Sequence, residues 1–465
     1  MCIRDRDSPE QHYTDTLTAA CGLADPNAVW GMTQAASELV RSLHHLGVQF
    51  NVTDDDELDL RNFGGQKKKR TAFAQSDTGK QLMTALIDAV RREESAGTVE
   101  RFPHHKFRTL LLSGNICGGC TVQDTYTGEL LRFVCDAVLI ATGGLHGLFG
   151  DTTGSLANTG EVTAELFRLG VPMANLEMIQ YHPTTVELGE KRMLLSEAAR
   201  GEGGRLFALR NGKPWYFMEE KYPELGNLMP RDITAREVWT VSRDYEVFLD
   251  MTELPKEVME HKLAGLVDDC QTYLHKDIRK EPIPILPGIH YFMGGIQVDE
   301  RHRTSMRNLY AAGECCAQYH GANRLGGNSL LGAIYGGQIA AETACRETVS
   351  SPNMPCAEES LLPELSPDAQ MQMNRILLNA LGVVRDAQTL EAGIQEIRKL
   401  SGTLPLLGCA MLESALARKE SRGAHWRADY PQRNDAVYCK TTVAHWNGQH
   451  IAISFESIPE RRHDL

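Results

Sequence analysis

The run Asn308-Leu-Tyr-Ala-Ala-Gly-Glu314 and the later run Gly321-Ala-Asn-Arg-Leu-Gly-Gly-Asn-Ser-Leu330 carry the strongest fold signal in this chain. The first run is apolar and ends in glycine, which is typical of a buried strand. The second is a glycine-rich turn, and small and apolar residues at helical spacing follow it over 329–344. A helix N-terminus has free N–H groups and a positive dipole, so this turn favours binding of an anionic group.

A second strand-and-glycine unit lies earlier in the chain, at Val138-Leu-Ile-Ala-Thr-Gly-Gly144. Glycines at this point let a backbone approach a flat or phosphorylated ligand, because no Cβ intervenes. Apolar or alternating runs before it predict three strands, over 107–112, 120–126 and 131–141. Helical spacing of apolar residues predicts two amphipathic helices, over 26–48 and 79–91. The pattern is that of an α/β fold.

The length of 465 residues predicts two or three domains. Between 211 and 288, proline and charged residues become frequent, which indicates a separate mixed unit. After a linker rich in Ser, Pro and Glu at 349–367, the spacing predicts three helices, over 371–384, 387–400 and 407–419. The net charge of −13 argues against a nucleic-acid partner. The longest apolar runs are strand-sized, so membrane association would need a partner.

Three smaller features favour simple interpretations. The twelve cysteines are scattered, which favours reduced thiols in a cytoplasmic protein. Cys117-Gly-Gly-Cys120 lacks a second pair at metal-binding spacing, so we expect no metal site and interpret it as a hairpin tip. The basic run Lys67-Lys-Lys-Arg70 is interpreted as a solvated loop. Residues 1–6 show no targeting, helix or strand pattern and are excluded from fold reasoning.

A set of histidines, arginines and one serine lies in turns that contain glycine or proline, where binding groups usually occur. The set is His182, Ser196, Arg200, Arg231, His290 and Arg324. It matches the needs of a small dicarboxylate, because guanidinium groups hold carboxylates by charge-assisted, partly bidentate hydrogen bonds.

Five strings are more specific than any single residue. They are Gln180-Tyr-His-Pro-Thr184, Ser196-Glu-Ala-Ala-Arg-Gly-Glu-Gly-Gly204, Arg231-Asp232, His290-Tyr-Phe-Met-Gly-Gly-Ile296, and Gly313-Glu314 through His320-Gly-Ala-Asn-Arg-Leu-Gly-Gly-Asn-Ser-Leu330. Together they resemble the succinate dehydrogenase/fumarate reductase flavoprotein family. The likeness extends from Asp7 to Pro431 and so covers nearly the whole chain.

The resemblance implies a discontinuous α/β architecture with FAD as cofactor. A Rossmann-like FAD-binding domain would comprise 7–179 and 289–348, with an α+β capping domain inserted over 180–288 and a helical domain over 365–465. The cap would lie over the flavin, because it contains His182 and Arg231. The positions that match flavin contacts are Thr142, Gly143, Gly144, Glu161, Glu314, Asn328, Ser329 and Leu330.

The resemblance also implies a reaction, the interconversion of succinate and fumarate. Hydride passes between flavin N5 and one alkene carbon, and an arginine handles the proton at the other. Arg231 matches this acid, and Glu197 with Arg200 matches a proton relay, since a carboxylate and a second arginine can pass the proton onward. The positions that match the carboxylate-binding groups are His182, Ser196, His290 and Arg324.

The sequence departs from the family pattern in several places. Ser196 replaces the usual threonine and Glu161 the usual aspartate, and two loop spacings differ by one or two residues. The family begins with a strand, a Gly-x-Gly-x-x-Gly turn and a helix, then a segment whose histidine often bonds to the flavin. The sequence joins the pattern behind both, at Asp7, so we interpret it as truncated and expect the chain as given to bind flavin poorly.

Other functions remain open from the sequence. L-aspartate oxidase resembles this family but carries a glutamate where Arg61-Asn-Phe-Gly-Gly65 has Phe63, so the unaminated dicarboxylate is favoured. A soluble fumarate reductase is a further alternative. A non-catalytic flavoprotein remnant fits less well, because the catalytic set is intact. The direction of the reaction cannot be read, since both directions use the same residues.

The resemblance implies partners as well. We expect an iron–sulfur subunit and a membrane anchor that reacts with quinone, because no iron–sulfur spacing, haem signature or membrane span is evident in this sequence. Such partners would hold the chain peripherally on the cytoplasmic face of the cell membrane.

Overall fold

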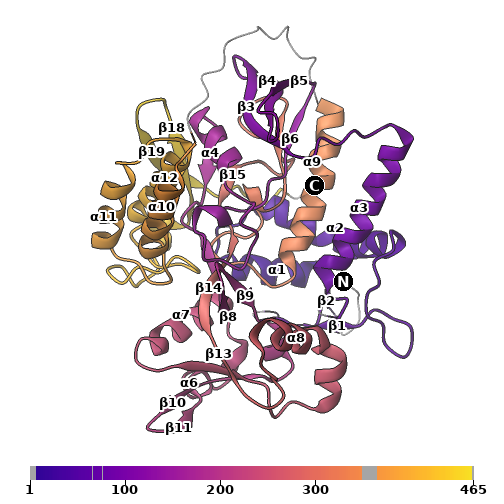
Figure 1. The fold of residues 1–465 in the computed structure, drawn as a ribbon, viewed down its shortest axis with the longest axis vertical. Coiled ribbons are helices and arrows are strands. Elements are labelled where there is room, and N and C mark those ends of the chain that lie inside the picture. The colour runs from indigo at the N-terminus through magenta and orange to yellow at the C-terminus, as the bar shows by residue number, and fades with distance from the viewer. Residues whose placement is uncertain (1–6, 65, 67, 76, 348–363, 463–465) are drawn as a thin grey trace.

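The computed structural model describes residues 7–64, 66, 68–75, 77–347 and 364–462. Figure 1 shows a central α/β region, a lower unit formed by the middle of the chain, and C-terminal helices on one side. This arrangement confirms the predicted α/β fold with an inserted unit. The opening residues 1–6 and nearly all of the predicted linker lie outside the described residues.

The two strand-and-glycine units of the sequence pair with each other in the central region. β6 (Val138–Ile140) and β16 (Leu309–Ala311) are parallel neighbours. The carboxyl ends of parallel strands meet at one edge, so the glycines after β6 and Glu314 after β16 come together there. A separate sheet contains three short central strands, β7 (Met173–Ala174), β15 (Gly295–Gln297) and β17 (Cys316–Ala317).

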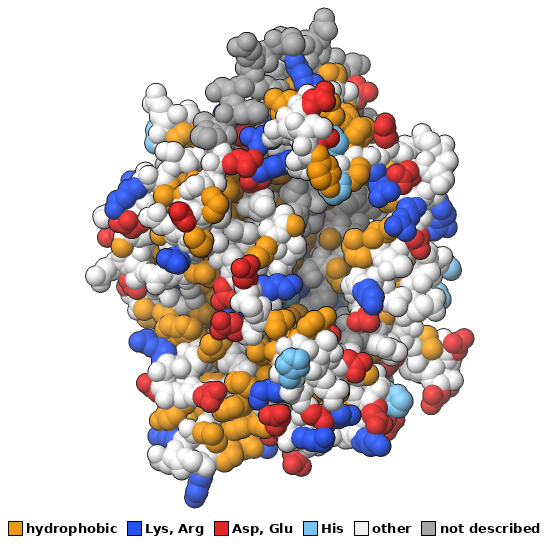
Figure 2. Space-filling model, viewed as in Figure 1, with side chains coloured by type: hydrophobic (Ala, Val, Ile, Leu, Met, Phe, Trp, Pro, Cys, Tyr) orange, Lys and Arg blue, Asp and Glu red, His pale blue; other side chains and the backbone are white. Residues whose placement is uncertain are grey.

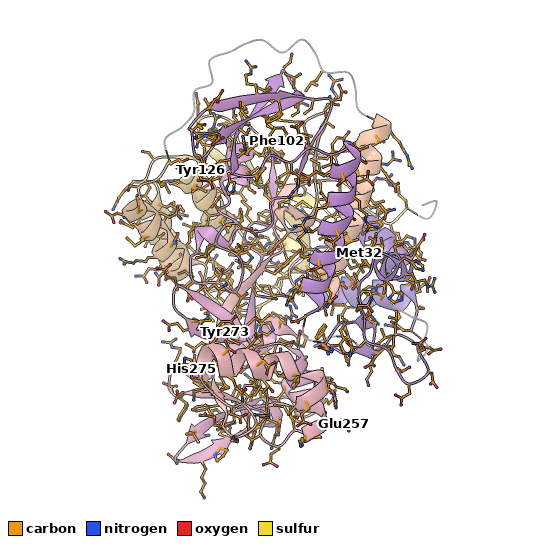
Figure 3. All side chains as sticks on the ribbon, turned by 45° about the vertical axis from the view of Figure 1, so that its right-hand side comes forward. Met32, Phe102, Tyr126, Glu257, Tyr273 and His275 are labelled. Carbon is orange, nitrogen blue, oxygen red and sulfur yellow. The ribbon has the colours of Figure 1, made fainter. Side chains whose placement is uncertain are left out.

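Five helices surround these strands. They are α1 (Pro9–Ala19), α2 (Pro26–His45), α3 (Thr78–Ala96), α4 (Glu161–Arg168) and α9 (Asn328–Glu347). Asp25 caps α2 by accepting hydrogen bonds from the next backbone N–H groups, and proline occupies the first helical position. Met32 of α2, labelled in Figure 3, packs in a small core with Leu331 of α9. The short pair β1 (Leu60–Arg61) and β2 (Thr71–Ala72) lies between α2 and α3 in the chain.

An antiparallel sheet of three strands lies at the top of Figure 1. Its strands are β3 (His105–Ser113), β4 (Ile116–Asp124) and β5 (Leu130–Val134). The predicted hairpin tip at Cys117–Cys120 was wrong, because all four residues lie within β4 and the turn falls at Gly114. Gly119 is required for close approach, since a Cβ there would lie 1.9 Å from the Phe133 carbonyl oxygen. The single predicted strand over 131–141 is likewise two strands, β5 and β6.

The inserted unit, which we call the cap, contains two sheets with the orders β14-β8-β9 and β11-β10-β12-β13. Its strands are β8 (Ile179–Leu188), β9 (Lys191–Leu194), β10 (Arg205–Arg210), β11 (Lys213–Trp215), β12 (Val247–Asp250), β13 (Ile283–Pro284) and β14 (Leu286–Phe292). Its α-helices are α5 (Ala198–Gly201), α6 (Phe217–Lys221), α7 (Arg231–Ser242) and α8 (Ala264–Asp269). The cap has its own apolar core, which includes Leu206 and Val238. The chain enters and leaves it through β8 and β14, which are adjacent antiparallel strands.

The C-terminal helices share the core of the central region. α10 (Pro367–Ala380), α11 (Ala387–Ile397) and α12 (Thr403–Ala417) confirm the three predicted helices. Leu377 and Leu407 belong to the same buried cluster as Phe167 of α4. The predicted helical domain over 365–465 also contains two strands, which the sequence did not predict. After α13 (Asp435–Tyr438), β18 (Lys440–Trp446) and β19 (Ile451–Ser457) form a hairpin that pairs with β7 and extends the central sheet.

The surface carries charges of both signs. On the face in Figure 2, Lys and Arg side chains are interspersed with Asp and Glu. The interpretation of 67–70 as a solvated loop was wrong for Arg70, which is buried and forms ion pairs with Asp7 at 3.0 Å and Asp15 at 2.7 Å. Those two carboxylates supply the countercharge that a buried guanidinium needs. In the described part of the chain, no helix is long and apolar enough to cross a membrane.

Candidate functional site

Two histidines meet where the cap joins the central region. The ring centroids of His182 in β8 and His290 in β14 are 5.2 Å apart. In the register of these strands Tyr181 faces Ile289 and Gln180 faces Tyr291, so His290 is the extra residue of a bulge. A bulge re-aims a side chain, which explains how His290 reaches His182. Burial, followed by neighbouring positive charges, holds the pKa of both histidines well below the ordinary value.

A buried carboxylate holds two arginines of the cap. Glu197 accepts hydrogen bonds from Arg231 Nε at 2.9 Å and Nη2 at 2.5 Å, from Arg200 Nη2 at 3.2 Å and from the Gly64 backbone N–H at 3.2 Å. Burial alone would raise the pKa of Glu197, but the charges of Arg231 and Arg200 outweigh it and lower that pKa to about 2. The carboxylate is therefore ionised at neutral pH. The three-residue spacing of Glu197 and Arg200 places both on one side of the α5 turn.

Gln180 connects the cap arginine to the glycine-rich turn before α9. Its Oε1 accepts a hydrogen bond from Arg231 Nη1 at 3.0 Å, and its Nε2 donates to the Arg324 carbonyl oxygen and to Asn323 Oδ1, both at 2.9 Å. Asn323 in turn donates to Asp232 of α7 at 2.9 Å. The network fixes the position of Arg231 relative to the segment that carries Arg324.

Arg324 is a buried cation that has no counterion in the described part of the chain. Its guanidinium lies over the Tyr291 ring at 4.3 Å, and within the described ranges it has no hydrogen bond or ion pair. Burial, with a smaller contribution from Arg231, lowers its pKa to about 9, so the group is still charged at neutral pH. Burial of an uncompensated charge is costly, and an anion in the cavity would relieve that cost.

One cavity of about 260 Å³ brings these groups together. The predicted residues that line it are His182, Ser196, Glu197, Arg231, His290, Arg324, Asn328, Ser329 and Leu330. Arg200 does not line it and lies fully buried behind Glu197. Phe63 also lines the cavity, as do other apolar residues that include Leu39 and Phe73. A cationic pocket beside an apolar wall fits a small anion next to a flat ring.

The strand ends near the cavity form a cradle that excludes side chains. A Cβ on Gly144 would lie 2.6 Å from Glu314 Oε1, and one on Gly326 would lie 2.7 Å from the Phe63 Cβ. Gly143 has φ +72°, which favours glycine. Glu314 is held in place because its Oε1 accepts a hydrogen bond from the Phe292 backbone N–H at 3.0 Å. Close backbone approach and the N-terminus of the 20-residue helix α9 fit a flat cofactor with anionic character.

The side chains of Glu161 and Asn328, two predicted cofactor residues, are held by other contacts. Glu161, at the start of α4, forms an ion pair with Lys106 at 2.9 Å and lines a different cavity. Asn328 lines the main cavity, but its side chain is engaged by α1, with 2.9 Å to His12 Nε2 and 3.0 Å to Thr16 Oγ1. Thr142 is exposed next to Gly143.

Two residues of the site, Gln180 and Arg61, were not predicted from the sequence. Gln180 lies in the string Gln180-Tyr-His-Pro-Thr184, but it is uncharged, so its residue type gave no sign that it belongs to the site. Arg61 lines the cavity, stacks on Phe73 at 3.5 Å, and burial lowers its pKa to about 10. Its place two residues before Phe63 is evident from the sequence. Its burial is not, because that depends on the pairing of β1, which contains Arg61, with β2.

Loss of the Glu197 carboxylate should destabilise the protein in a pH-dependent way. Glu197→Gln leaves Arg231 and Arg200 without their countercharge, which should lower the free energy of unfolding by about 3 kcal/mol at pH 7. The folded-state pKa of about 2 lies below the ordinary value of 4.5. The contribution is therefore fully present above pH 4.5 and is lost as the pH falls toward 2. Urea unfolding from pH 7 to pH 3 should show the difference between wild type and variant shrinking.

The matched control is Glu219→Gln, which removes the half-exposed ion pair with Arg205. It should cost less than about 1 kcal/mol. A pH-independent difference for Glu197→Gln would contradict the assignment of an ionised, arginine-held carboxylate.

Two known families match this chain. Residues 3–330 match the family described as FAD binding domain, and residues 401–462 match the family described as fumarate reductase flavoprotein C-term. The succinate dehydrogenase flavoprotein subunit of Bacillus subtilis is 37% identical over an alignment of 505 positions, which covers 97% of this chain and 86% of that protein.

Two further relatives differ from each other in their named activities. The L-aspartate oxidase of Streptomyces coelicolor is 30% identical over 506 residues, which cover 98% of this chain and 86% of that protein. Among solved structures, the FrdA chain of Escherichia coli quinol fumarate reductase is 26% identical and superposes with a TM-score of 0.88. That match covers 98% of this chain and 88% of the FrdA chain.

Proposed function

This chain belongs to the succinate dehydrogenase/fumarate reductase flavoprotein family, and we propose that it interconverts succinate and fumarate in a cavity closed by the cap. The observation that carries the proposal is the buried Arg324 guanidinium, which has no counterion among the residues that the structure describes and lines one cavity with Arg231, His182 and His290. Two arginines from different domains can each hold one carboxylate of a small dicarboxylate.

FAD is the cofactor of this family, and the cradle fits it. Thr142, Gly143, Gly144 and Glu314 would hold it at the strand ends, with Ser329 and Leu330 at the start of α9. Glu161 remains a predicted contact. When bound, FAD supplies the site that accepts or donates hydride. The residues of this chain position the substrate and handle its proton.

We assign the proton transfer to Arg231. In fumarate reduction one alkene carbon receives hydride and the other receives a proton, so the products balance as succinate. Arg231 lines the cavity, and its guanidinium is fixed by Glu197 on one side and Gln180 on the other. Glu197 is ionised and can accept a proton, and Arg200 lies directly behind it. Glu197 and Arg200 thus form a route by which Arg231 regains its proton.

The remaining cavity residues bind carboxylate groups. His182, Ser196 and His290 line the cavity from the cap, whereas Arg324 lines it from the turn before α9. Hydrogen bonds and charge at both carboxylates draw electron density from the alkene and so favour hydride attack. Closure of the cap would exclude water from the reacting atoms.

Assays of both directions test the proposal. The FAD-loaded protein should reduce fumarate with a low-potential electron donor and should oxidise succinate with a dye acceptor. Heat-inactivated protein and protein without FAD are the controls. Activity with neither compound, despite bound FAD, would contradict the proposed function.

L-aspartate oxidation is the second candidate, because two relatives named L-aspartate oxidase are 30% and 35% identical to this chain. The resemblance places a glutamate where this chain has Phe63, and such a carboxylate can meet the substrate ammonium. The apolar Phe63 packs against the glycine-rich turn at Gly326 and offers no such partner. The cavity therefore favours the unaminated dicarboxylate.

Phe63→Glu should shift the substrate preference. A carboxylate in the cavity repels a dicarboxylate and attracts an ammonium group, so kcat/KM for succinate should fall at least roughly tenfold. L-aspartate oxidation should become measurable. Phe63→Leu keeps an apolar side chain and should stay within about threefold of wild type. Unchanged succinate kinetics in Phe63→Glu would exclude Phe63 as a determinant of specificity.

We propose an iron–sulfur subunit and a quinone-reactive membrane anchor as electron-transfer partners. The support is that the Bacillus subtilis relative is named a subunit and the Escherichia coli relative is part of a quinol fumarate reductase. Peripheral attachment on the cytoplasmic face of the membrane follows from such partners. Affinity purification from the native membrane fraction should recover both. An active, monomeric enzyme that uses a diffusible donor would instead support the soluble-reductase alternative.

A further inference from the structure

The hydroxyl group of Thr153 contacts the catalytic cavity through His290. Thr153 Oγ1 lies 2.9 Å from His290 Nδ1 and 3.2 Å from the Ile289 carbonyl oxygen. The Thr153 backbone N–H also donates to that carbonyl, at 3.0 Å, so the loop is tied to β14. Thr153 belongs to the central region, outside the cap, and is not among the site residues predicted from the sequence.

The hydrogen bonds around Thr153 favour a proton on Nδ1 of His290. A carbonyl oxygen only accepts, so the contact with Ile289 directs the hydroxyl proton of Thr153 to that carbonyl. The hydroxyl oxygen then accepts from His290 Nδ1–H. A neutral His290 protonated at Nδ1 has a bare lone pair at Nε2. A lone pair repels a carboxylate, so the neutral ring cannot donate a hydrogen bond to the substrate.

We propose that Thr153 is a positioning residue that keeps Nδ1 of His290 protonated, so that His290 binds a dicarboxylate only as the imidazolium and substrate binding takes up one proton. With the proton added at Nε2, the ring donates to Thr153 and to the substrate carboxylate at the same time. The inference rests on the proposed function, because it requires a dicarboxylate in this cavity.

The surroundings of His290 explain why it is neutral before an anion arrives. The charged and titratable groups that face it are His182 from β8, Arg231 from α7, Arg324 from the turn before α9, and His146 from the turn after β6. Burial and then these groups all disfavour a further positive charge. The two negative charges of a dicarboxylate reverse that balance.

Proton uptake can be measured directly with malonate, a dicarboxylate that has no CH–CH bond to oxidise. We expect calorimetric titration of the FAD-loaded protein at pH 7.5, in buffers of different ionisation enthalpy, to show uptake of about one proton per malonate. The dissociation constant should rise about tenfold per pH unit where this uptake occurs. His290→Gln, which cannot titrate, should bind malonate without proton uptake.

Variants of Thr153 separate the positioning role from a structural one. Thr153→Ser keeps the hydroxyl and should retain affinity and uptake, whereas Thr153→Val should weaken malonate binding about tenfold and reduce the uptake. Thr125→Val is the matched control, because it removes an exposed hydroxyl–carbonyl hydrogen bond in the turn after β4. Melting temperature checks the fold of each variant.

Three results would overturn the inference. They are malonate binding to the wild type without proton uptake, full uptake in His290→Gln, and unchanged affinity and uptake in a folded Thr153→Val. The wild-type and His290→Gln measurements do not depend on folding of Thr153→Val. Absence of malonate binding by the wild type would count against the proposed function itself, and so is distinguishable from these results.

Discussion

Arg231→Lys is expected to reduce turnover by roughly 10³-fold while changing dicarboxylate affinity less than about tenfold. Lysine keeps the positive charge, but it cannot reproduce the planar contacts of the Arg231 guanidinium with Glu197 and Gln180. Proton delivery therefore fails, whereas attraction of a carboxylate persists. The measurement pairs steady-state fumarate reduction with calorimetric malonate binding.

Arg236→Lys is the matched control for Arg231→Lys. Arg236 lies on the same helix, α7, but its guanidinium stacks on Trp426 at 3.9 Å and does not line the cavity. Its replacement should leave turnover within about threefold of wild type, as for a surface substitution. Near-normal turnover in Arg231→Lys would show that another group supplies the proton.

Arg324→Met is expected to weaken dicarboxylate binding at least roughly 100-fold and to reduce kcat/KM by at least as much. The guanidinium is desolvated and has no counterion among the residues described, so an anionic substrate is its natural partner. Methionine has a similar length and no charge. The same change removes an uncompensated buried charge, so the protein without substrate should become more stable to urea.

Stability and binding should thus change in opposite directions in Arg324→Met. Malonate should raise the urea midpoint of the wild type and leave that of the variant unchanged. Arg301→Met, which removes an exposed ion pair with Glu347, is the control and should alter neither quantity appreciably. Wild-type malonate affinity in Arg324→Met would exclude Arg324 as a substrate ligand.

Helices were predicted correctly from the sequence where the local pattern of apolar residues agreed with the tertiary structure. The helical spacing of apolar residues predicted α2, α3, α10 and α11, because each buries one apolar face, and α12, which is apolar and buried nearly all round. The hairpin β18–β19 was missed because the place of its two seven-residue strands in the central sheet depends on pairing with β7, more than 260 residues earlier. The interpretation of Gly119 as part of a hairpin tip failed for a related reason. It signals close approach to the Phe133 carbonyl on the next strand, and not a turn.

The sequence by itself determined the α/β class, the family resemblance, and the residue types that the cavity requires. Glycine, histidine and arginine at fixed spacings carry that information locally, because a turn, a charge or a hydrogen-bonding group is a property of the residue. Only the tertiary structure decided which of these groups act together. The bulge at His290, the link from Gln180 to Arg231 and the missing counterion of Arg324 arise from contacts between distant segments. Burial removes water as the alternative partner, so each of those contacts depends on the fold that excludes the water.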